Sequence, residues 1–337
     1  MATYKVLKGL TIQELSSDPA VLAKGEVWYN STAETLKAVS QVGAWSTGGA
    51  QTTQQVGAAS GGTQTAAWVC SGQSPGGSPA APTETLFYNG TAWTDQSAAL
   101  SVTNSGYIGS TGTQASALLA GGTPLPGTIA AEWGGSSWTT ITNEPIGRRY
   151  TAGFGASGTS AYMAGGATWA GAGLTKTGAL ESWNGTSWTS ENAMSEARLL
   201  SSGGSGTATT GIVIAGHVRP PHPGAYNTDL VEEFNGTAWS AGTVYPSAAS
   251  SVSSGGPQAA LIAYGGPGAS TDCFQFDGTT WTAVASLATG RGSGGRSVGG
   301  TTSAQLYAGG TPNPGASPGT QVEEYNLADA AVTFTAT

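Results

Sequence analysis

The chain has 337 residues, of which Lys, Arg, Asp and Glu make up only 9%, against roughly 25% in an average soluble domain. Its 11 basic and 19 acidic residues give a net charge of −8, which argues against a nucleic-acid-binding surface. Its 11 Trp, 11 Tyr and 6 Phe argue against disorder, because so many large aromatic side chains can form a buried core.

The first 45 residues stand apart from the rest of the chain. Lys5 and Lys8 interrupt the opening segment, so we expect no signal peptide and a protein made in a cytoplasm. No stretch reaches the roughly 18 apolar residues of a membrane-spanning helix, so no membrane insertion is expected. Residues 26–32, followed by Leu36, predict a hairpin. This hairpin either completes a seventh repeat or forms a separate attachment element, and the lack of further strands at either end favours attachment.

A short phrase then recurs along the chain. It consists of an aromatic residue, Asn-Gly or Asp-Gly (Gly-Gly in the second copy), two small residues and a Trp, as in Tyr88 to Trp93. Asn-Gly is a preferred hairpin turn because both turn positions favour positive φ, so the phrase predicts paired strands. The copies occupy residues 88–93, 133–138, 183–188, 234–239 and 276–281, with a degenerate copy at 325–327.

A second phrase precedes each hairpin: an apolar run that ends in small residues, usually Gly-Gly. Further upstream lies a strand of tiny residues, such as 201–206, which suits an innermost position where neighbouring backbones crowd around an axis. The apolar runs occupy residues 68–72, 117–122, 161–166, 211–216, 261–266 and 305–310. Four strands in about 47 residues, repeated, predict an all-β fold of propeller blades.

These repeats resemble the kelch family, whose blades pair Gly-Gly after the second strand with an aromatic residue before the final hairpin and a Trp within it. The resemblance implies a six-bladed β-propeller over residues 46–337, with seven blades as the alternative. The kelch-type Arg at the start of the first strand is patchy, with Arg198 and Arg291 as candidates, and Val332 or Phe334 would replace the missing sixth Trp. The expected blades are 50–95, 98–140, 148–189, 198–240, 246–282 and 290–334.

The segment from Asp18 to Lys37 resembles segments near the start of bacteriophage tail-fibre and tail-associated proteins. Together with the Gly/Ser/Thr-rich repeats, this resemblance implies a virion structural protein, associated with a tail or a capsid. Residues 1–45 would contact other virion proteins, and the protein would be oligomeric in the particle. The propeller would meet a host-surface glycan or protein, with no enzymatic activity and no cofactor.

Two enzyme classes of propeller architecture provide the main alternatives. Galactose-oxidase-like copper enzymes need two His from separate blades, whereas His217 and His222 share one proline-rich loop, so we expect no metal. Sialidase-like enzymes need several converging Arg, and no acid–base pair can be named here. A cellular kelch adaptor that binds a protein partner is a third alternative.

Acidic residues near the hairpins could form a carboxylate ring only if they occupied equivalent positions. They do not keep one register, so we interpret them as solvated strand residues. The set is Glu84, Glu132, Glu181, Glu232, Glu233, Glu323 and Glu324. Cys70 and Cys273 fall in different blades, too far apart for a disulfide, and are expected to be free thiols packed as small apolar residues.

Proline marks the predicted binding face. Twelve of the 16 prolines lie in loops between the Gly-Gly strand and the hairpin, and equivalent loops of successive blades project from one face. Stiff loops on a rigid scaffold are typical of binding surfaces, although they could also pack against neighbouring subunits. The side chains best suited to a sugar or a flat partner are Trp169, His217, Arg219, His222 and Tyr226.

Overall fold

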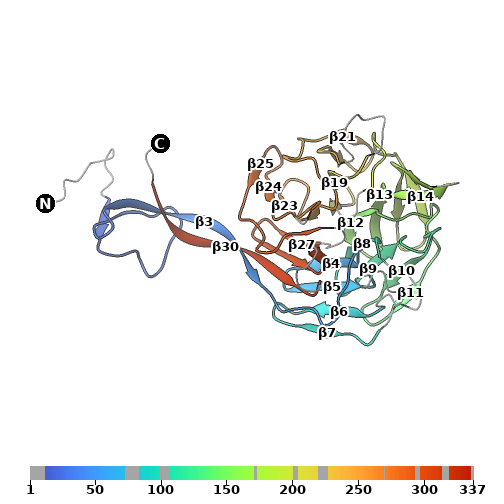
Figure 1. Cartoon of the computed structure of the whole chain (residues 1–337), viewed down its shortest axis with the longest axis horizontal. Helices are drawn as coiled ribbons and strands as arrows, with labels where there is room; N and C mark the ends of the chain where they lie inside the picture. The colour runs from blue at the N-terminus through green and yellow to red at the C-terminus, as the bar shows by residue number, and fades with distance from the viewer. Residues whose placement is uncertain are drawn as a thin grey trace. The chain divides into compact units, whose positions relative to one another are not determined.

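The computed structural model describes residues 12–72, 83–98, 100, 106–170, 173–199, 204–218, 227–268, 270–292, 297–312 and 319–334. Within these ranges the chain forms strands β1 to β30 and contains no helix (Figure 1). The predicted all-β class is confirmed. A search of the described ranges for a helix that is long and apolar enough to cross a membrane finds none.

The chain divides into two compact units. The first unit contains residues 1–44 and 326–337, and the second contains residues 45–325. The division falls inside two long strands, β3 (Thr35–Thr47) and β30 (Val322–Thr333). The repeat pattern predicts that residues 326–334 belong to the last blade. That assignment is wrong, because these residues belong to the first unit together with residues 1–44.

The second unit is built from antiparallel sheets, most of which have four strands in chain order. The first sheet consists of β4 (Ala59–Thr63), β5 (Ala66–Cys70), β6 (Thr85–Tyr88) and β7 (Trp93–Asp95). The second sheet consists of β8 (Gly109–Gly112), β9 (Ala117–Ala120), β10 (Ala130–Trp133) and β11 (Trp138–Thr140). The third sheet consists of β12 (Ala152–Ser157), β13 (Ser160–Ala164), β16 (Leu180–Trp183) and β17 (Trp188–Glu191). The fourth sheet consists of β18 (Gly204–Thr207), β19 (Thr210–Ile214), β20 (Val231–Phe234) and β21 (Trp239–Ala241). The fifth is β22 (Ser253–Gly255), β23 (Leu261–Tyr264), β24 (Cys273–Phe276), β25 (Trp281–Ala283).

The remaining sheet combines strands from both ends of the chain. Its order is β1-β2-β3-β30-β28-β27, where β27 is Ser297–Thr301 and β28 is Ala304–Ala308. Within the second unit it therefore contributes β27, β28, Val322–Tyr325 of β30 and Trp45–Thr47 of β3. Two short pairs complete the unit: β14 (Ala167–Ala170) with β15 (Gly173–Lys176), and β26 (Arg291–Gly292) with β29 (Thr311–Pro312).

The innermost strands form a closed ring, in which β4, β8, β12, β18, β22 and β27 contact one another in order and β27 returns to β4 (Figure 1). Their tiny side chains allow this crowding, as the sequence predicts. A Cβ added to Gly153 would lie 2.2 Å from the carbonyl oxygen of Ser110, and one added to Gly61 would lie 2.6 Å from that of Gly112. Larger residues at these positions would force neighbouring sheets apart.

The repeated hairpins are present, but their turns differ from the predicted type. In the first, Tyr88 pairs with Trp93, and Asn89 to Ala92 form a four-residue turn. Gly90 has φ 90°, whereas Asn89 is not among the residues with positive φ. The Asn89 Oδ1 instead accepts the backbone N–H of Thr91 and Ala92. The Asn is therefore favoured because its side chain satisfies turn amides, and not for its tolerance of positive φ.

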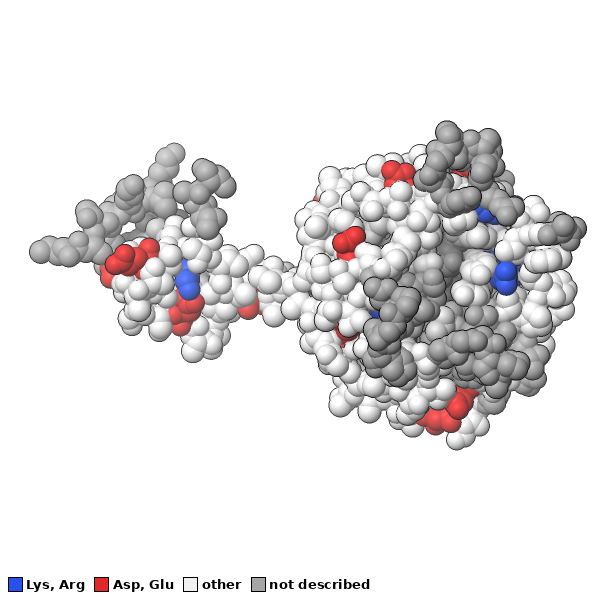
Figure 2. Space-filling model, in the orientation of Figure 1, with Lys and Arg blue, Asp and Glu red and all other residues white. Residues whose placement is uncertain are grey.

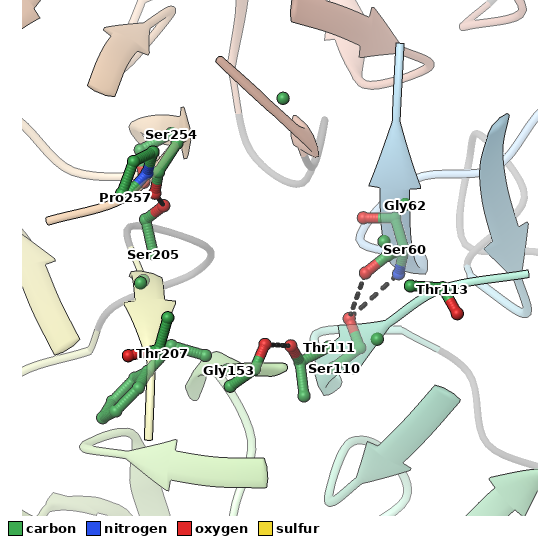
Figure 3. A pocket seen from close by; sticks show the side chains of 18 of the residues that line it. Ser60, Gly62, Ser110, Thr111, Thr113, Gly153, Ser205, Thr207, Ser254 and Pro257 are labelled. Carbon is green, nitrogen blue, oxygen red and sulfur yellow. Dashed lines mark hydrogen bonds between the residues drawn. The ribbon is translucent and has the colours of Figure 1, made fainter. Parts of the chain in front are cut away.

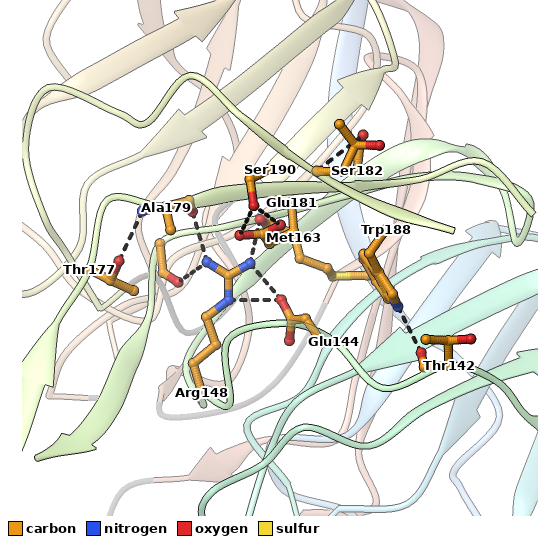
Figure 4. A network of polar contacts seen from close by, with 12 residues as sticks. Thr142, Glu144, Arg148, Met163, Thr177, Ala179, Glu181, Ser182, Trp188 and Ser190 are labelled. Carbon is orange, nitrogen blue, oxygen red and sulfur yellow. Dashed lines mark hydrogen bonds and ion pairs between the residues drawn. The ribbon is translucent and has the colours of Figure 1, made fainter. Parts of the chain in front are cut away.

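Three buried arginines bind the backbone beside the second and third strands within their own sheets. Arg148, Arg198 and Arg291 are fully buried, and each pairs with a glutamate: Glu144, Glu232 and Glu323 respectively. The Arg148 Nη1 also donates to the carbonyl oxygens of Gly165 and Ala179, and its Nη2 donates to Met163 (Figure 4). Arg198 and Arg291 repeat the two Nη1 bonds in their own sheets.

The interpretation of the hairpin glutamates as solvated residues is wrong for three of them. Glu181, Glu232 and Glu323 are 1%, 4% and 4% exposed, and each is the second residue of the segment that forms the third strand of its sheet. They thus do keep one register, in the three sheets that also contain a buried arginine. Burying a carboxylate is costly unless it is paired and hydrogen-bonded, and the neighbouring arginines and hydroxyls meet that need.

The missing Trp of the last sheet is supplied from the other end of the chain. Trp45 packs against Tyr264 and Tyr325, with ring centroids 5.1 and 5.4 Å apart, and its Nε1 donates to the carbonyl oxygen of Ala285 at 2.9 Å. The repeat tryptophans Trp188, Trp239 and Trp281 likewise donate to a carbonyl of the preceding sheet's outer loop. The expectation that Val332 or Phe334 would take this place is wrong, since both lie in the first unit.

Cys70 and Cys273 are free and buried, which confirms the prediction of two packed thiols. Burial raises the pKa of each thiol to about 12. Both side chains are therefore protonated near neutral pH, and thiolate chemistry is disfavoured.

The first unit contains the predicted hairpin. In it, β2 (Val27–Asn30) pairs antiparallel with the start of β3, and β1 (Gln13–Leu15) pairs parallel with β2. Asp18 organises one face of this small sheet. Its carboxylate accepts hydrogen bonds from Trp28 Nε1 at 3.2 Å and Asn30 Nδ2 at 2.8 Å, and pairs with Lys37 Nζ at 2.7 Å.

The Asp18 contacts make the first unit sensitive to acid. The hydrogen bond from Lys37, followed by that from Asn30, holds the pKa of Asp18 below its usual 3.8. The stabilisation is therefore present above pH 3.8 and is lost as the pH falls through the lower pKa of the folded unit. At pH 7, we expect Asp18→Asn to speed amide hydrogen exchange in residues 27–38 relative to the wild type. Mass spectrometry should show the two chains converging once Asp18 is protonated, and equal protection at pH 7 would contradict the assignment.

Candidate binding site on the loop face

One edge of the ring carries the long loops. Because the strands of each sheet alternate in direction, the loop between the second and third strands and the loop into the next innermost strand leave from the same side. We call this side the loop face. The prolines of this face that lie within the described residues are Pro124, Pro126, Pro267 and Pro312. The other eight of the predicted set lie outside the described residues.

Two tyrosines stand in an unusual backbone conformation where the chain enters the innermost strands. Tyr107 and Tyr150 have φ of 58° and 60°, and their ring centroids lie 4.2 Å apart. The Tyr107 amide donates to Gly57, and the Tyr150 amide donates to Tyr107, so the bonds run from one sheet to the next. Burial, and then the Tyr150 hydroxyl, raises the pKa of Tyr107. Positive φ is uncommon at bulky residues, and it recurs at the corresponding positions Gly57 and Ser251, so this conformation belongs to the repeat.

A cation and an exposed indole continue from these rings. The guanidinium of Arg149 lies 4.9 Å from the Tyr150 ring centroid, and its backbone exchanges hydrogen bonds with Ala167 at the start of β14. Trp169 follows on the same strand and is 59% exposed. The β14–β15 hairpin pairs Trp169 with Leu174, so strand pairing fixes the backbone that carries the indole.

The same hairpin adds Lys176, and the neighbouring sheet adds His217. Lys176 pairs with Ala167 across the β14–β15 hairpin, and its Nζ lies 3.3 Å from Nδ1 of His217. His217 is half-buried and bridges Leu199 and Asn227 through its backbone. We define the aromatic–cation row as Tyr107, Tyr150, Arg149, Trp169, Lys176 and His217. It crosses three successive sheets.

The structure therefore brings two of the predicted site residues, Trp169 and His217, onto adjacent elements. The other three, Arg219, His222 and Tyr226, lie outside the described residues. Sequence reasoning missed Tyr107, Tyr150, Arg149 and Lys176. The prolines and the aromatic residues of the loops indicate this face in the sequence, but nothing in the sequence indicates a positive φ at tyrosine.

A cavity of about 350 Å³ lies inside the ring (Figure 3). Its described lining comes from much of the length of the innermost strands and from some of the turns that follow them. Apart from Phe154 and Pro257, the described lining consists of Gly, Ser and Thr. Some hydroxyls are used between sheets: Ser110 Oγ bonds the backbone of Ser60, and Thr111 Oγ1 donates to Gly155. This lining offers hydrogen bonds but no ionisable side chain.

Charged side chains are sparse on the surface shown in Figure 2. No group of three or more His, Cys, Asp or Glu that could hold a metal ion occurs in the described part of the chain. The arginines that a sialidase-like site would direct into the central cavity are also absent from its described lining. Three of them, Arg148, Arg198 and Arg291, are used inside the sheets.

No family model and no curated protein sequence matches the chain. Among solved structures, it is similar to one titled "Structure of YjhT", with 16% sequence identity and a TM-score of 0.60. The match covers 83% of this chain and 99% of the other. At this identity the likeness concerns the fold alone. Together with the closed ring of antiparallel sheets, it is consistent with a β-propeller.

Proposed function

We propose that this chain is a bacteriophage virion protein, associated with a tail or a capsid, that displays a rigid propeller without catalysing a reaction. The ring order of the innermost strands supports six kelch-like blades in preference to seven. The last blade would combine β27, β28, Val322–Tyr325 and Trp45–Thr47. The first unit, which contains both ends of the chain, would attach the propeller to the particle.

The observation that carries the display role is the aromatic–cation row on the loop face. Aromatic rings offer flat apolar surfaces to the C–H faces of a sugar, while Arg149 and Lys176 can donate hydrogen bonds to hydroxyls or carboxylates. The row stands on hydrogen-bonded strands and bridges, so little conformational entropy is lost when it meets a ligand. A host-surface glycan, acidic sugars included, fits this chemistry.

Trp169→Ala tests this role. We expect it to weaken binding of the full chain to host cells, or to a glycan-array ligand, at least tenfold, because the exposed indole would supply most of the apolar contact. Thr168→Ala is the matched control, since Thr168 lies on the same hairpin and its hydroxyl bonds Thr175. Flow cytometry with labelled protein gives the readout. Equal binding by both variants and the wild type, or no binding by the wild type, would contradict the proposal.

A further inference from the structure

The first unit has very little core of its own. Among its described residues only Trp28 and Asn30 are buried. Beyond β2, the unit continues as a ribbon of β3 and β30, and two-stranded ribbons are marginally stable in water. Small domains with so little burial usually need a further source of stability, and oligomerisation is one of the common sources.

The register of this ribbon is the same at both ends. The amide of Phe334 donates to the carbonyl of Leu36, and the amide of Gly48 donates to that of Val322. The two bonds are the same number of residues apart on both strands. The side chains of β3 and β30 therefore alternate between the two faces with no net shift in strand register. Leu36 and Phe334 therefore share a face, and every second residue from each belongs to that face.

That face is apolar. β2 adds to it, because Val27 pairs with Ala38 and Tyr29 with Leu36. Glu14, on the edge strand beside Tyr29, is the one charged residue that the pairing places there. We define the apolar face as Val27, Tyr29, Leu36, Ala38, Ser40, Val42, Ala44, Asn326, Ala328, Ala330, Val332 and Phe334.

The apolar face is open, whereas the opposite face is partly covered. Asp18 binds Trp28, Asn30 and Lys37, which all point to the opposite face. On the apolar face Val27 is 41%, Val42 44% and Phe334 56% exposed. The ribbon part alone spans about 30 Å by 10 Å, or roughly 300 Å², which is within the range of the largest apolar patch on a typical monomer, a patch that is often functional.

We propose that the apolar face is the interface at which two or more copies of this chain associate. The centre of the face carries only Ala, Ser and Val, so it is flat, and two such faces can approach as stacked sheets do, about 10 Å apart. With Glu14 as the one charge that the strand pairing places on it, the face lacks the cluster of charges that would select an oppositely charged partner. A unit that cannot bury enough surface alone needs a partner that is present whenever it folds, and another copy of the chain always is. The inference deepens the proposed attachment role of this unit and rests on it.

Val42 and Gln41 are neighbours on opposite faces of β3, which provides a matched test. Sedimentation velocity of the full wild-type chain should show an oligomer at micromolar concentration. Val42→Lys should raise the dissociation constant at least 100-fold, because it places a charge in an apolar contact, and Gln41→Lys should leave it unchanged. Ala328→Lys, on the paired strand of the same face, should act like Val42→Lys.

Two outcomes would overturn the inference. One is a wild-type chain that is monomeric at 100 μM, including a chain that assembles only on a different virion protein. The other is equal weakening by Val42→Lys and Gln41→Lys, which would indicate general destabilisation. Host-surface binding is measured separately with Trp169→Ala, so the two proposals fail independently. An oligomer that binds no host surface would refute display alone, and a monomer that binds would refute this interface alone.

Discussion

Replacing Arg148 by alanine is expected to lower the free energy of unfolding by about 3–5 kcal/mol. The change leaves the buried carboxylate of Glu144 without its cation and removes the donors to Met163, Gly165 and Ala179. Burial already raises the pKa of Glu144, so without the guanidinium this group should take up a proton more readily. Urea denaturation followed by tryptophan fluorescence measures the loss.

Arg149→Ala is the control for this experiment. Arg149 is the adjacent residue, is only partly buried and has its guanidinium over the Tyr150 ring, so we expect a loss below about 1 kcal/mol. An insoluble Arg148→Ala chain beside a soluble Arg149→Ala chain would agree with the prediction. Equal denaturation midpoints for the two variants would show that the buried pair is not a structural requirement.

Trp45→Ala is expected to destabilise the propeller by about 3 kcal/mol, although Trp45 is more than two hundred residues from its partners in the sequence. The change removes the ring contacts with Tyr264 and Tyr325 and the hydrogen bond to Ala285, and leaves a cavity in the last sheet. The propeller's transition in a calorimetric scan should move to lower temperature.

Two exposed aromatic residues serve as comparisons for Trp45. Trp169→Ala and Phe334→Ala should each leave the propeller transition within about 0.5 kcal/mol of the wild type. If Phe334→Ala lowered the transition and Trp45→Ala did not, Phe334 would be the aromatic residue of the last sheet after all.

The repeats revealed most of the fold because each repeat is a local unit. Tyr88 and Trp93 are close in the chain, and so are the tiny strands and the apolar runs that pair with them. Trp45 was missed because its sheet is completed from far away in the sequence. A local signal was nevertheless present, since Ala44-Trp45-Ser46 repeats Ala238-Trp239-Ser240.

The polar core and the candidate site were harder to predict. Arg148 lies about as far before its Gly-Gly phrase as Arg198 and Arg291 do before theirs, which is a readable signal for the buried pairs. Whether a glutamate is solvated or buried depends on which face of its strand meets the next sheet, and that needs coordinates. The aromatic–cation row depends on backbone angles at Tyr107 and Tyr150, which tertiary packing imposes.

Because β3 pairs with β30, the ring of sheets can close only after β30 has been synthesised. Trp45–Thr47 emerge from the ribosome first, and their partner Val322–Tyr325 follows roughly tens of seconds later at typical elongation rates. During this interval the strands that will meet at the closure point remain unpaired, and an unpaired sheet edge can template aggregation. Premature termination anywhere before β30 would leave such an edge permanently, so abundant truncated products should be insoluble or degraded. Efficient production of this protein thus depends on translating the whole message.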